Sequence, residues 1–284
     1  MDYKNLIEKR QSCRDFTNKE IEQSSIKIIK EFFNSSLKFD NEEILLEAFP
    51  YAGKKLEGAI GYHGFALSAP MYLVLMGKKK NTSYIKAGFR GMNLILKLLD
   101  MGIHTCFLTV NDSEKTKKAL GIKNELEILS VIACGYAKEV KDLVRLDIKS
   151  PSDVEFISRK GYFAPKISLT EMVYVNEWGN KLEITDRFPG HILEESLYAA
   201  SLAPYFFNKQ EFRYILKDHK LILCNKNDEL VSCEDRLIGM GATMFNFFII
   251  YNRFNKKACM WTLDTTDIKI KIPNDYQLIA YMNI

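Results

Sequence analysis

The chain has 284 residues, which is enough for one large domain or for two fused halves. Hydrophobic residues make up 47% of it and charged residues 27%, a balance typical of a globular protein with a core. The net charge of +4 is small, and Lys and Arg are interspersed with Asp and Glu, so a nucleic-acid partner is not expected.

No segment has the ~18 uninterrupted apolar residues that a membrane-spanning helix needs, so no membrane association is expected. The first ten residues, MDYKNLIEKR, lack an apolar signal-peptide core, which favours a cytoplasmic location. The six cysteines include no C-x-x-C pair, and the four histidines have no ligand spacing. The sequence therefore predicts reduced thiols and no metal site.

The first part of the chain predicts alternating helices and strands. Residues 2–9 predict a short helix, and the capping-box pattern TNKE at 17–20 predicts the start of a second one. The apolar run at 69–76 predicts a buried strand, and helical periodicity then runs through 84–102. The following segments predict a strand in HTCFLTV, a helix in SEKTKKAL and a strand in LEILSVIACGYA.

The same order starts again after a polar, irregular segment at 138–170, which we interpret as a crossing segment or linker. Residues 191–204 predict a helix, 212–224 a strand or hairpin, and 235–254 a second long helix. The segments KACMWTL and YQLIAYMNI predict the last two strands.

Matching residues indicate that this restart is an internal repeat. Three residues recur in the same order and at the same intervals in the two parts: Gly88, Asn93 and Cys106, then Gly241, Asn246 and Cys259. CFLT at 106–109 also aligns with CMWT at 259–262. The repeat predicts two related α+β halves, at 1–150 and 151–284, packed face to face as an internal pseudo-dimer.

The stretch EKRQSCRDF at 8–16 gathers two arginines and a serine. Arg10, Ser12 and Arg14 alternate, so an extended backbone would bring their side chains to one side. Guanidinium forks and a hydroxyl suit the oxygens of a phosphate. From these residues alone, a solvated basic helix end is the more common explanation.

Together with a second segment, this pattern resembles the motifs of a known family. KRQSCRDF resembles the R-x-S-x-R/K-x-F opening of FMN-dependent nitroreductases, and SLAPYFFNKQEFRYIL at 201–216 resembles their A-P-S-x-x-N-x-Q-P-W-x-F segment. The matching residues are Ala203, Pro204, Asn208, Gln210, Phe212 and Tyr214. The chain departs from the pattern at Tyr205, Glu211 and Phe212, where the family has Ser, Pro and Trp. These departures bear on substrate preference more than on cofactor binding.

The resemblance covers nearly the whole chain and is to a branch in which two half-copies are fused. It implies a nitroreductase-like α+β fold. In dimeric members each flavin lies between two subunits, so here one site can form between the halves of one chain. The resemblance also implies FMN as the cofactor, and NAD(P)H and a small-molecule electron acceptor as partners. It implies no catalytic side chain, because the flavin carries the chemistry.

At the phosphate end of the cofactor, the resemblance assigns Arg10, Ser12 and Arg14 to the phosphate oxygens. Lys149, in IKSP, resembles the late basic residue that reaches the phosphate in the family, and Arg145 is the alternative.

At the ring end, Gln11 is expected to reach the edge of the isoalloxazine. Thr109 and Val110 match the family's backbone turn beside the flavin nitrogen that accepts hydride. The residues expected around the ring from the other half are Pro204, Tyr205, Phe206 and Asn208, of which Asn208 would donate a hydrogen bond. Phe207 is expected to pack in the core.

Three classes of function remain open. The first is an FMN-dependent NAD(P)H oxidoreductase of nitroreductase type that reduces nitro compounds, quinones or a similar acceptor. The second is a flavin-binding sensor or storage module without significant turnover. The third is an interaction protein built on a decayed enzyme. Uptake of FMN and steady-state oxidation of NAD(P)H separate them.

The repeat also predicts how many flavins bind. Aligning Phe16 with Phe188 puts the phosphate residues of the first half opposite Leu182, Ile184 and Asp186, and puts Asn208 opposite Ser36. On this register the second site has lost its cations and its N-x-Q segment. The sequence therefore predicts one FMN per chain and a monomer whose dimer interface is internal.

Overall fold

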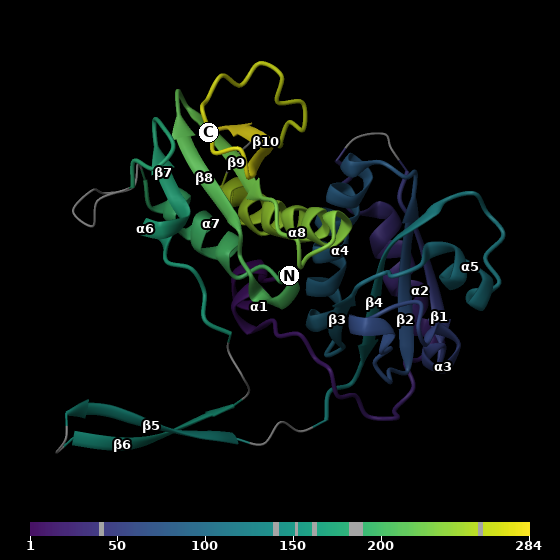
Figure 1. The fold of residues 1–284 in the computed structure, drawn as a ribbon. Helices are drawn as coiled ribbons and strands as arrows, with labels where there is room; N and C mark the ends of the chain where they lie inside the picture. Colours follow the sequence, from purple (N-terminus) through teal and green to yellow (C-terminus); the bar gives the residue numbers. More distant parts are fainter. Residues whose placement is uncertain (40–42, 139–141, 151–152, 161–163, 182–189, 255–257) are drawn as a thin grey trace.

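The computed structural model describes residues 1–39, 43–138, 142–150, 153–160, 164–181, 190–254 and 258–284. Two four-stranded sheets lie on either side of a central pair of long helices (Figure 1). One sheet has the strand order β1-β2-β4-β3 and the other the order β10-β9-β8-β7. This arrangement confirms the predicted α+β class with two tandem halves.

The first half contains one antiparallel sheet and its connecting helices. Its strands are β1 (Leu45–Pro50), β2 (Met71–Gly77), β3 (His104–Leu108) and β4 (Glu127–Gly135). Its helices are α1 (Tyr3–Lys9), α2 (Gln23–Ser35), α3 (Gly53–Leu56), the 3₁₀ turn η1 (Tyr62–Gly64), α4 (Asn81–Asp100) and α5 (Ser113–Leu120).

The second half repeats the hairpin and the long helix. Its strands are β7 (Val173–Val175), β8 (Phe212–Lys217), β9 (Lys220–Lys226) and β10 (Tyr276–Asn283). Its helices are α6 (Leu169–Met172), α7 (His191–Ser201), the turn η2 (Phe206–Asn208), α8 (Cys233–Tyr251) and the turn η3 (Asn252–Phe254).

The segment predicted to be an irregular linker contains an antiparallel hairpin. Its strands β5 (Asp142–Ser150) and β6 (Asp153–Lys160) pair with each other and project away from both halves (Figure 1). The predicted boundary between residues 150 and 151 falls between these two strands. After the hairpin, β7 joins the second sheet in parallel with β8.

The contact between the two long helices follows the repeat. A Cβ atom on Gly88 of α4 would overlap with the carbonyl oxygen of Ile238, and one on Gly241 of α8 would overlap with the carbonyl oxygen of Ile85. Each glycine therefore meets the residue three positions before the other glycine. Such reciprocal contacts are the signature of a two-fold relationship, so α4 and α8 cross at a pseudo-dyad.

Both faces of the first sheet are covered. In β2, Leu73 and Leu75 belong to the core shared with the long helices, whereas Tyr72 and Val74 belong to a separate outer cluster. A strand buried on both faces is expected to be an uninterrupted apolar run, as its sequence is.

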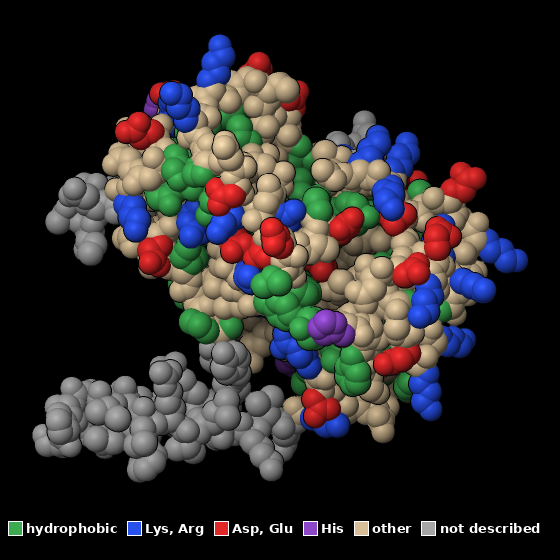
Figure 2. All heavy atoms as spheres, viewed as in Figure 1, with side chains coloured by type: hydrophobic (Ala, Val, Ile, Leu, Met, Phe, Trp, Pro, Cys, Tyr) green, Lys and Arg blue, Asp and Glu red, His purple; other side chains and the backbone are tan. Residues whose placement is uncertain are grey.

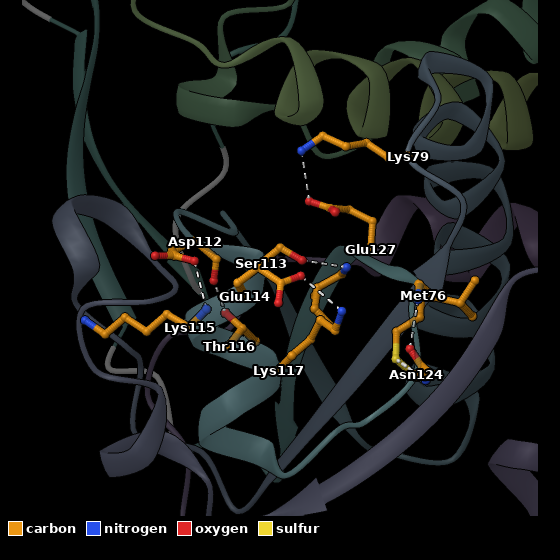
Figure 3. A network of polar contacts seen from close by, with 12 residues as sticks. Met76, Lys79, Asp112, Ser113, Glu114, Lys115, Thr116, Lys117, Asn124 and Glu127 are labelled. Carbon is orange, nitrogen blue, oxygen red and sulfur yellow. Dashed lines mark hydrogen bonds and ion pairs between the residues drawn. The ribbon is translucent and has the colours of Figure 1, made fainter.

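Helix α5 belongs to the outer layer of the first half and is anchored at its first turn (Figure 3). Asp112 caps it by accepting a hydrogen bond from the backbone N–H of Lys115 at 2.8 Å. The hydroxyl of Ser113 accepts one from the backbone N–H of Ile128, in β4, at 3.0 Å. The first bond caps the helix, and the second fixes α5 to the start of β4.

Two predicted elements are wrong in detail. Helix α2 begins at Gln23 and not at TNKE, because the preceding segment is tied to the end of β4: Thr17 donates its N–H to the carbonyl of Tyr136 at 2.8 Å. KACMWTL is not a strand. The side chain of Asn252 binds both the N–H and the carbonyl of Cys259, and the described part of the segment pairs with β10 only through an isolated bridge between Thr262 and Tyr281.

Among the described residues, no helix combines the length and the apolar character needed to cross a membrane. Over the same residues, His, Cys, Asp and Glu side chains form no group of three that could hold a metal ion.

Candidate functional site

The arginine-rich opening runs as an extended segment along the edge of the first sheet. Helix α1 ends at Lys9, and Arg10 has the extended angles φ −62° and ψ 126°. Ser12 forms a parallel bridge with Thr105 of β3, and the N–H of Cys13 donates to the carbonyl of Thr105 at 2.9 Å. This backbone pairing holds the segment beside the start of β3.

Arg10 reaches from the first half to the second. Its Nη2 donates to the carbonyl of Leu202, just after α7, at 3.4 Å. Its Nε is buried and has no hydrogen-bond partner among the described residues. Burial lowers the pKa of the Arg10 guanidinium to about 10, and the positive charge of Arg14 acts in the same direction. Arg10 is therefore a cation with an unused donor.

Lys166 brings a second cation to the same turn. Its Nζ donates to the carbonyl of Ala203 at 3.1 Å and to Oδ1 of Asn208 at 3.0 Å. Burial lowers the pKa of Lys166 to about 8, and the nearby charge of Arg10 contributes. In the described part of the chain, neither Arg10 nor Lys166 has an acidic partner. The two side chains thus create a local positive potential with which no described acidic side chain pairs.

The N-x-Q segment holds Lys166 in place. Asn208 donates its amide to the carbonyl of Pro165 at 2.7 Å. Gln210 accepts from the N–H of Ile167 at 2.9 Å and donates to the same Pro165 carbonyl at 3.0 Å. Asn208, expected to contact the flavin, therefore contacts the lysine segment in this structure.

The three residues expected to line one face of the flavin differ in their surroundings. Tyr205 packs against Gly239, where a Cβ would lie 2.5 Å from the ring, and its hydroxyl accepts a hydrogen bond from Asn225 at 2.7 Å. Burial raises the pKa of Tyr205 above its usual range. Pro204 and Phe206 are partly exposed. All three side chains are partly exposed, and Tyr205 is also fixed in orientation by its contacts with Gly239 and Asn225.

The turn at the end of β3 also contacts the second half. Thr109 donates its hydroxyl to Oδ2 of Asp235, in the first turn of α8, at 2.9 Å. Burial raises the pKa of Asp235. Val110 forms a bridge with Ile60, and the N–H of Gly61 donates to the carbonyl of Thr109 at 2.7 Å. This turn is held from both sides.

The remaining candidates are less defined. Arg14 is exposed, and Gln11 and Ser12 are partly exposed. The side chains of Lys149 and Arg145 lie outside the described residues, as do Leu182, Ile184, Asp186 and Phe188, on which the predicted loss of the second site depends.

The structure therefore brings Arg10 together with the segment around Asn208, which come from different halves. Sequence reasoning missed Lys166 and Asp235. Lys166 follows Pro165 in a segment interpreted as linker, and Asp235 looks like an ordinary acidic residue in the first turn of a helix. The expectation that Phe207 packs in the core is wrong, since its side chain is 54% exposed.

Solved structures of other proteins align with all or about half of this chain. A solved structure described as a "putative nitroreductase" from Thermotoga maritima aligns with 100% of this chain and 94% of that chain, with 15% identity and a TM-score of 0.60. A nitroreductase family protein from Streptococcus pneumoniae covers 54% of this chain and 99% of its own, with 17% identity and a TM-score of 0.44. A "putative nitroreductase" in complex with FMN from Desulfovibrio desulfuricans covers 49% and 88%, with 15% identity and a TM-score of 0.44.

No curated protein matches the sequence of this chain. The family model described as "Putative TM nitroreductase" matches residues 2–249, which is most of the chain. The chain therefore belongs to this nitroreductase family.

Proposed function

We propose that the chain is an FMN-dependent oxidoreductase that passes hydride from NAD(P)H, through bound FMN, to a nitro compound, a quinone or a similar acceptor. The observation that supports this most directly is the pair Arg10 and Lys166. Two partly buried cations from different halves bind neighbouring carbonyls and have no acidic partner among the described residues. Like charges at short range disfavour each other, so an anion between them would stabilise both.

The phosphate of FMN fits the donors that are present. It carries roughly two negative charges near neutral pH and three acceptor oxygens. The unused Nε of Arg10 can donate to one oxygen, and a guanidinium suits two-point binding of phosphate. Ser12 and Arg14 follow on the same extended segment. On this proposal Lys166, which Asn208 holds in position, is the late basic residue in place of Lys149.

The flavin would supply the hydride chemistry, and the residues of this chain would bind, orient and limit access to it. The ring would lie toward the turn of Thr109 and Val110 and the segment from Pro204 to Phe206. Asp235 fixes the Thr109 hydroxyl, so the turn has a defined geometry before any ligand binds. Preformed sites bind at a lower entropic cost than flexible ones.

We also propose one FMN per chain and a monomeric enzyme. On the register that matches Gly88 with Gly241, the counterpart of Thr109 is Thr262 and that of Asp235 is Thr82. Thr82 has no carboxylate, so the second pair lacks the charged acceptor that binds Thr109 in the first. A second flavin site would therefore lack the preformed turn of the first.

The direct test is titration of the apo-protein with FMN, followed by flavin fluorescence. We expect one tight site, and each of Arg10→Met and Lys166→Met should weaken it by about tenfold to a hundredfold, because charge-assisted bonds contribute roughly 1.5–3 kcal/mol each. The control is Lys138→Met, which removes one charge from an exposed lysine paired with Asp15. Unchanged affinity in both site variants would contradict the assignment of the site.

Turnover is tested separately. The FMN-loaded protein should oxidise NADH or NADPH continuously when ferricyanide is added as an electron acceptor that needs no aromatic binding site. A protein that binds FMN but shows no turnover with either nucleotide would be a flavin-binding module instead.

A further inference from the structure

Two thiols lie next to each other where the arginine-rich segment runs beside the first sheet. Ser12 forms a parallel bridge with Thr105 of β3. Cys13 and Cys106 are the residues that follow on the two segments, and the N–H of Cys13 donates to the carbonyl of Thr105 at 2.9 Å. Side chains at matching positions of neighbouring strands point to the same face. The two cysteines therefore share one face of the sheet.

The apolar packing agrees with this placement and separates the pair from a third cysteine nearby. Cys106 belongs to the outer cluster of the first half, and Cys13 packs against that cluster. Cys134 pairs with Thr105 from the other side and belongs to the core shared with the long helices. Cys134 therefore lies on the opposite face from Cys106, and Cys13 is the thiol that can reach Cys106.

The spacing of the two segments suits a disulfide. Neighbouring strands lie about 4.8 Å apart, and the Cα atoms of two bridged cysteines are roughly 4.4–6.8 Å apart. Both cysteines are free thiols in this structure. The Sγ of Cys13 donates to the carbonyl of Asp15 at 3.2 Å, and that of Cys106 to the carbonyl of Phe107 at 3.4 Å. A thiol is a weak donor, so these bonds do little to keep the sulfurs apart.

We propose that Cys13 and Cys106 are a redox pair, which a hydroperoxide converts into a disulfide, and that this disulfide weakens FMN binding. The formation of the disulfide is independent of the proposed function. Its effect on FMN rests on the proposed function, because it requires the phosphate to bind at the arginine-rich segment.

The oxidation takes place in two steps. The thiolate of Cys13 attacks one oxygen of hydrogen peroxide, so that an S–O bond forms, the O–O bond breaks and hydroxide leaves. The sulfur of Cys106 then attacks the sulfur of Cys13, so that the S–S bond forms and the S–O bond breaks. The departing hydroxyl leaves as water with the proton of Cys106. The two sulfurs together lose two electrons, and the peroxide is reduced to water.

The surroundings of the pair suit an uncharged oxidant that reacts first at Cys13. Cys13 is partly exposed, whereas Cys106 is buried. Burial raises the pKa of both thiols, and the positive charge of Arg14 acts against this at each of them, which favours the reactive thiolate. On the face drawn in Figure 2, the described Lys and Arg side chains are mixed with Asp and Glu side chains. Hydrogen peroxide needs no area of one charge to reach the protein.

The disulfide would move the arginine-rich segment and not β3. Strand β3 pairs with β4 along its whole length, whereas Ser12 makes a single bridge to β3. The Cβ atoms of a disulfide are about 3.8 Å apart, closer than the roughly 4.5–5.5 Å of directly opposed residues on neighbouring strands. Cys13 is therefore drawn toward Cys106. Ser12 and Arg14, on either side of it, would leave the positions from which they can bind a phosphate.

The disulfide is tested first by counting thiols. The full chain without FMN is treated with hydrogen peroxide, the peroxide is removed, and the denatured protein is alkylated with iodoacetamide. Mass spectrometry should find that two of the six thiols have become unreactive, and that dithiothreitol restores both. Trypsin without reductant should release residues 11–14 joined to residues 98–115. Alkylation of all six thiols after peroxide, or a disulfide between other cysteines, would overturn the inference.

Variants identify the partners. In Cys13→Ser and in Cys106→Ala, peroxide should leave every remaining thiol open to alkylation. Cys233→Ser is the matched control, since Cys233 is also partly buried but lies at the start of α8. This variant should lose two thiols to peroxide, as the wild type does. If Cys13→Ser loses them as well, the pair is wrongly assigned.

The effect on the cofactor is measured by titration with FMN. The peroxide-treated wild type should bind FMN about tenfold more weakly than the reduced protein, the scale of one lost charge-assisted hydrogen bond, and dithiothreitol should restore the affinity. Cys13→Ser should bind FMN equally before and after peroxide. Equal affinity of the oxidised and reduced wild type would overturn the coupling. If the reduced wild type does not bind FMN, the proposed function is wrong, and the thiol count still decides whether the redox pair exists.

Discussion

The two halves share the contact between their long helices but differ at the ends of those helices. Gly88 and Gly241 meet the opposite backbone reciprocally, as a duplicated interface should. At the end of β3, Thr109 binds Asp235 and leads into the capped helix α5, whereas Thr262 only bridges Tyr281 and leads into an irregular segment. The contact between the long helices has kept its symmetry, while the segments that follow Thr109 and Thr262 have not. Close backbone packing tolerates no added side chain, which keeps this contact the same in both halves.

The largest expected effect concerns the shared contact. Gly241→Ala and Gly88→Ala should each destabilise the fold by about 3 kcal/mol, because the new methyl group meets backbone that cannot turn aside. Thermal and urea unfolding measure this loss. Gly91→Ala, in α4, is the control: its Cβ would lie 3.2 Å from side-chain atoms of Leu75 and Phe107, which can adjust. Similar stability of the Gly91 and Gly241 variants would argue against the pseudo-dyad contact.

The second effect tests Lys166, which the second half contributes to the candidate site. Burial lowers its pKa to about 8, so its neutral fraction in the free protein increases above that pH. Phosphate binds the ammonium form, so FMN affinity should fall by up to about tenfold as the pH rises through 8. Lys166→Arg should remove this fall, because a guanidinium stays charged. A wild-type curve parallel to that of Lys166→Met would exclude Lys166 from the phosphate site.

A smaller effect is expected for Asn208→Ala. The variant loses the oxygen that holds Lys166 and the amide that binds Pro165. FMN affinity should weaken by about fivefold, the scale of one hydrogen bond, while the melting temperature stays near that of the wild type. Asn180→Ala is the control. It removes a side-chain hydrogen bond to the carbonyl of Val175, which is not part of the candidate site, and should leave FMN affinity unchanged.

The smallest effect contrasts two acids of the second half, Asp235 and Asp264, whose pKa values are shifted in opposite directions. Burial raises the pKa of Asp235, so its neutral form stabilises the fold at low pH, and this contribution is lost as the pH rises through the raised value. Asp235→Asn should therefore gain stability relative to the wild type as the pH rises above the usual pKa of an aspartate.

The comparison residue is Asp264, whose pKa is lowered by hydrogen bonds from Thr266. Its ionised form is the stabilising one, so Asp264→Asn should lose stability relative to the wild type over the same pH range. Unfolding curves at several pH values measure both. The same sign for the two variants would contradict the described surroundings of Asp235.

The elements that were predicted correctly are those whose own residues show a clear apolar run or helical periodicity. The apolar run of β2 and the periodicity of α4 and α8 identified these elements, and the spacing of Gly88 and Gly241 identified the repeat. The strand prediction for KACMWTL failed because the side chain of Asn252, and not a neighbouring strand, binds the backbone of Cys259. Asn252 lies outside the apolar segment itself, so the pattern of that segment does not record the contact.

Only the parts of the candidate site that match the motifs of the family were predictable from the sequence. It identified the arginine segment and the N-x-Q segment, which the structure brings together through Arg10 and Leu202. Lys166 was missed because its importance comes from its position beside Arg10 and Asn208, and not from its neighbours in sequence. The outward position of Phe207 was missed for a related reason, since hydrophobic character predicts burial and its φ of 50° is invisible in the sequence.

The covalent link between the halves has a consequence for dilution. Two separate subunits share a site only while they remain associated, so lowering their concentration empties the site. Here Arg10 and Leu202 belong to one polypeptide, and each half experiences the other at a fixed effective concentration set by the chain between them. The candidate site therefore contains residues of both halves at any concentration of the protein.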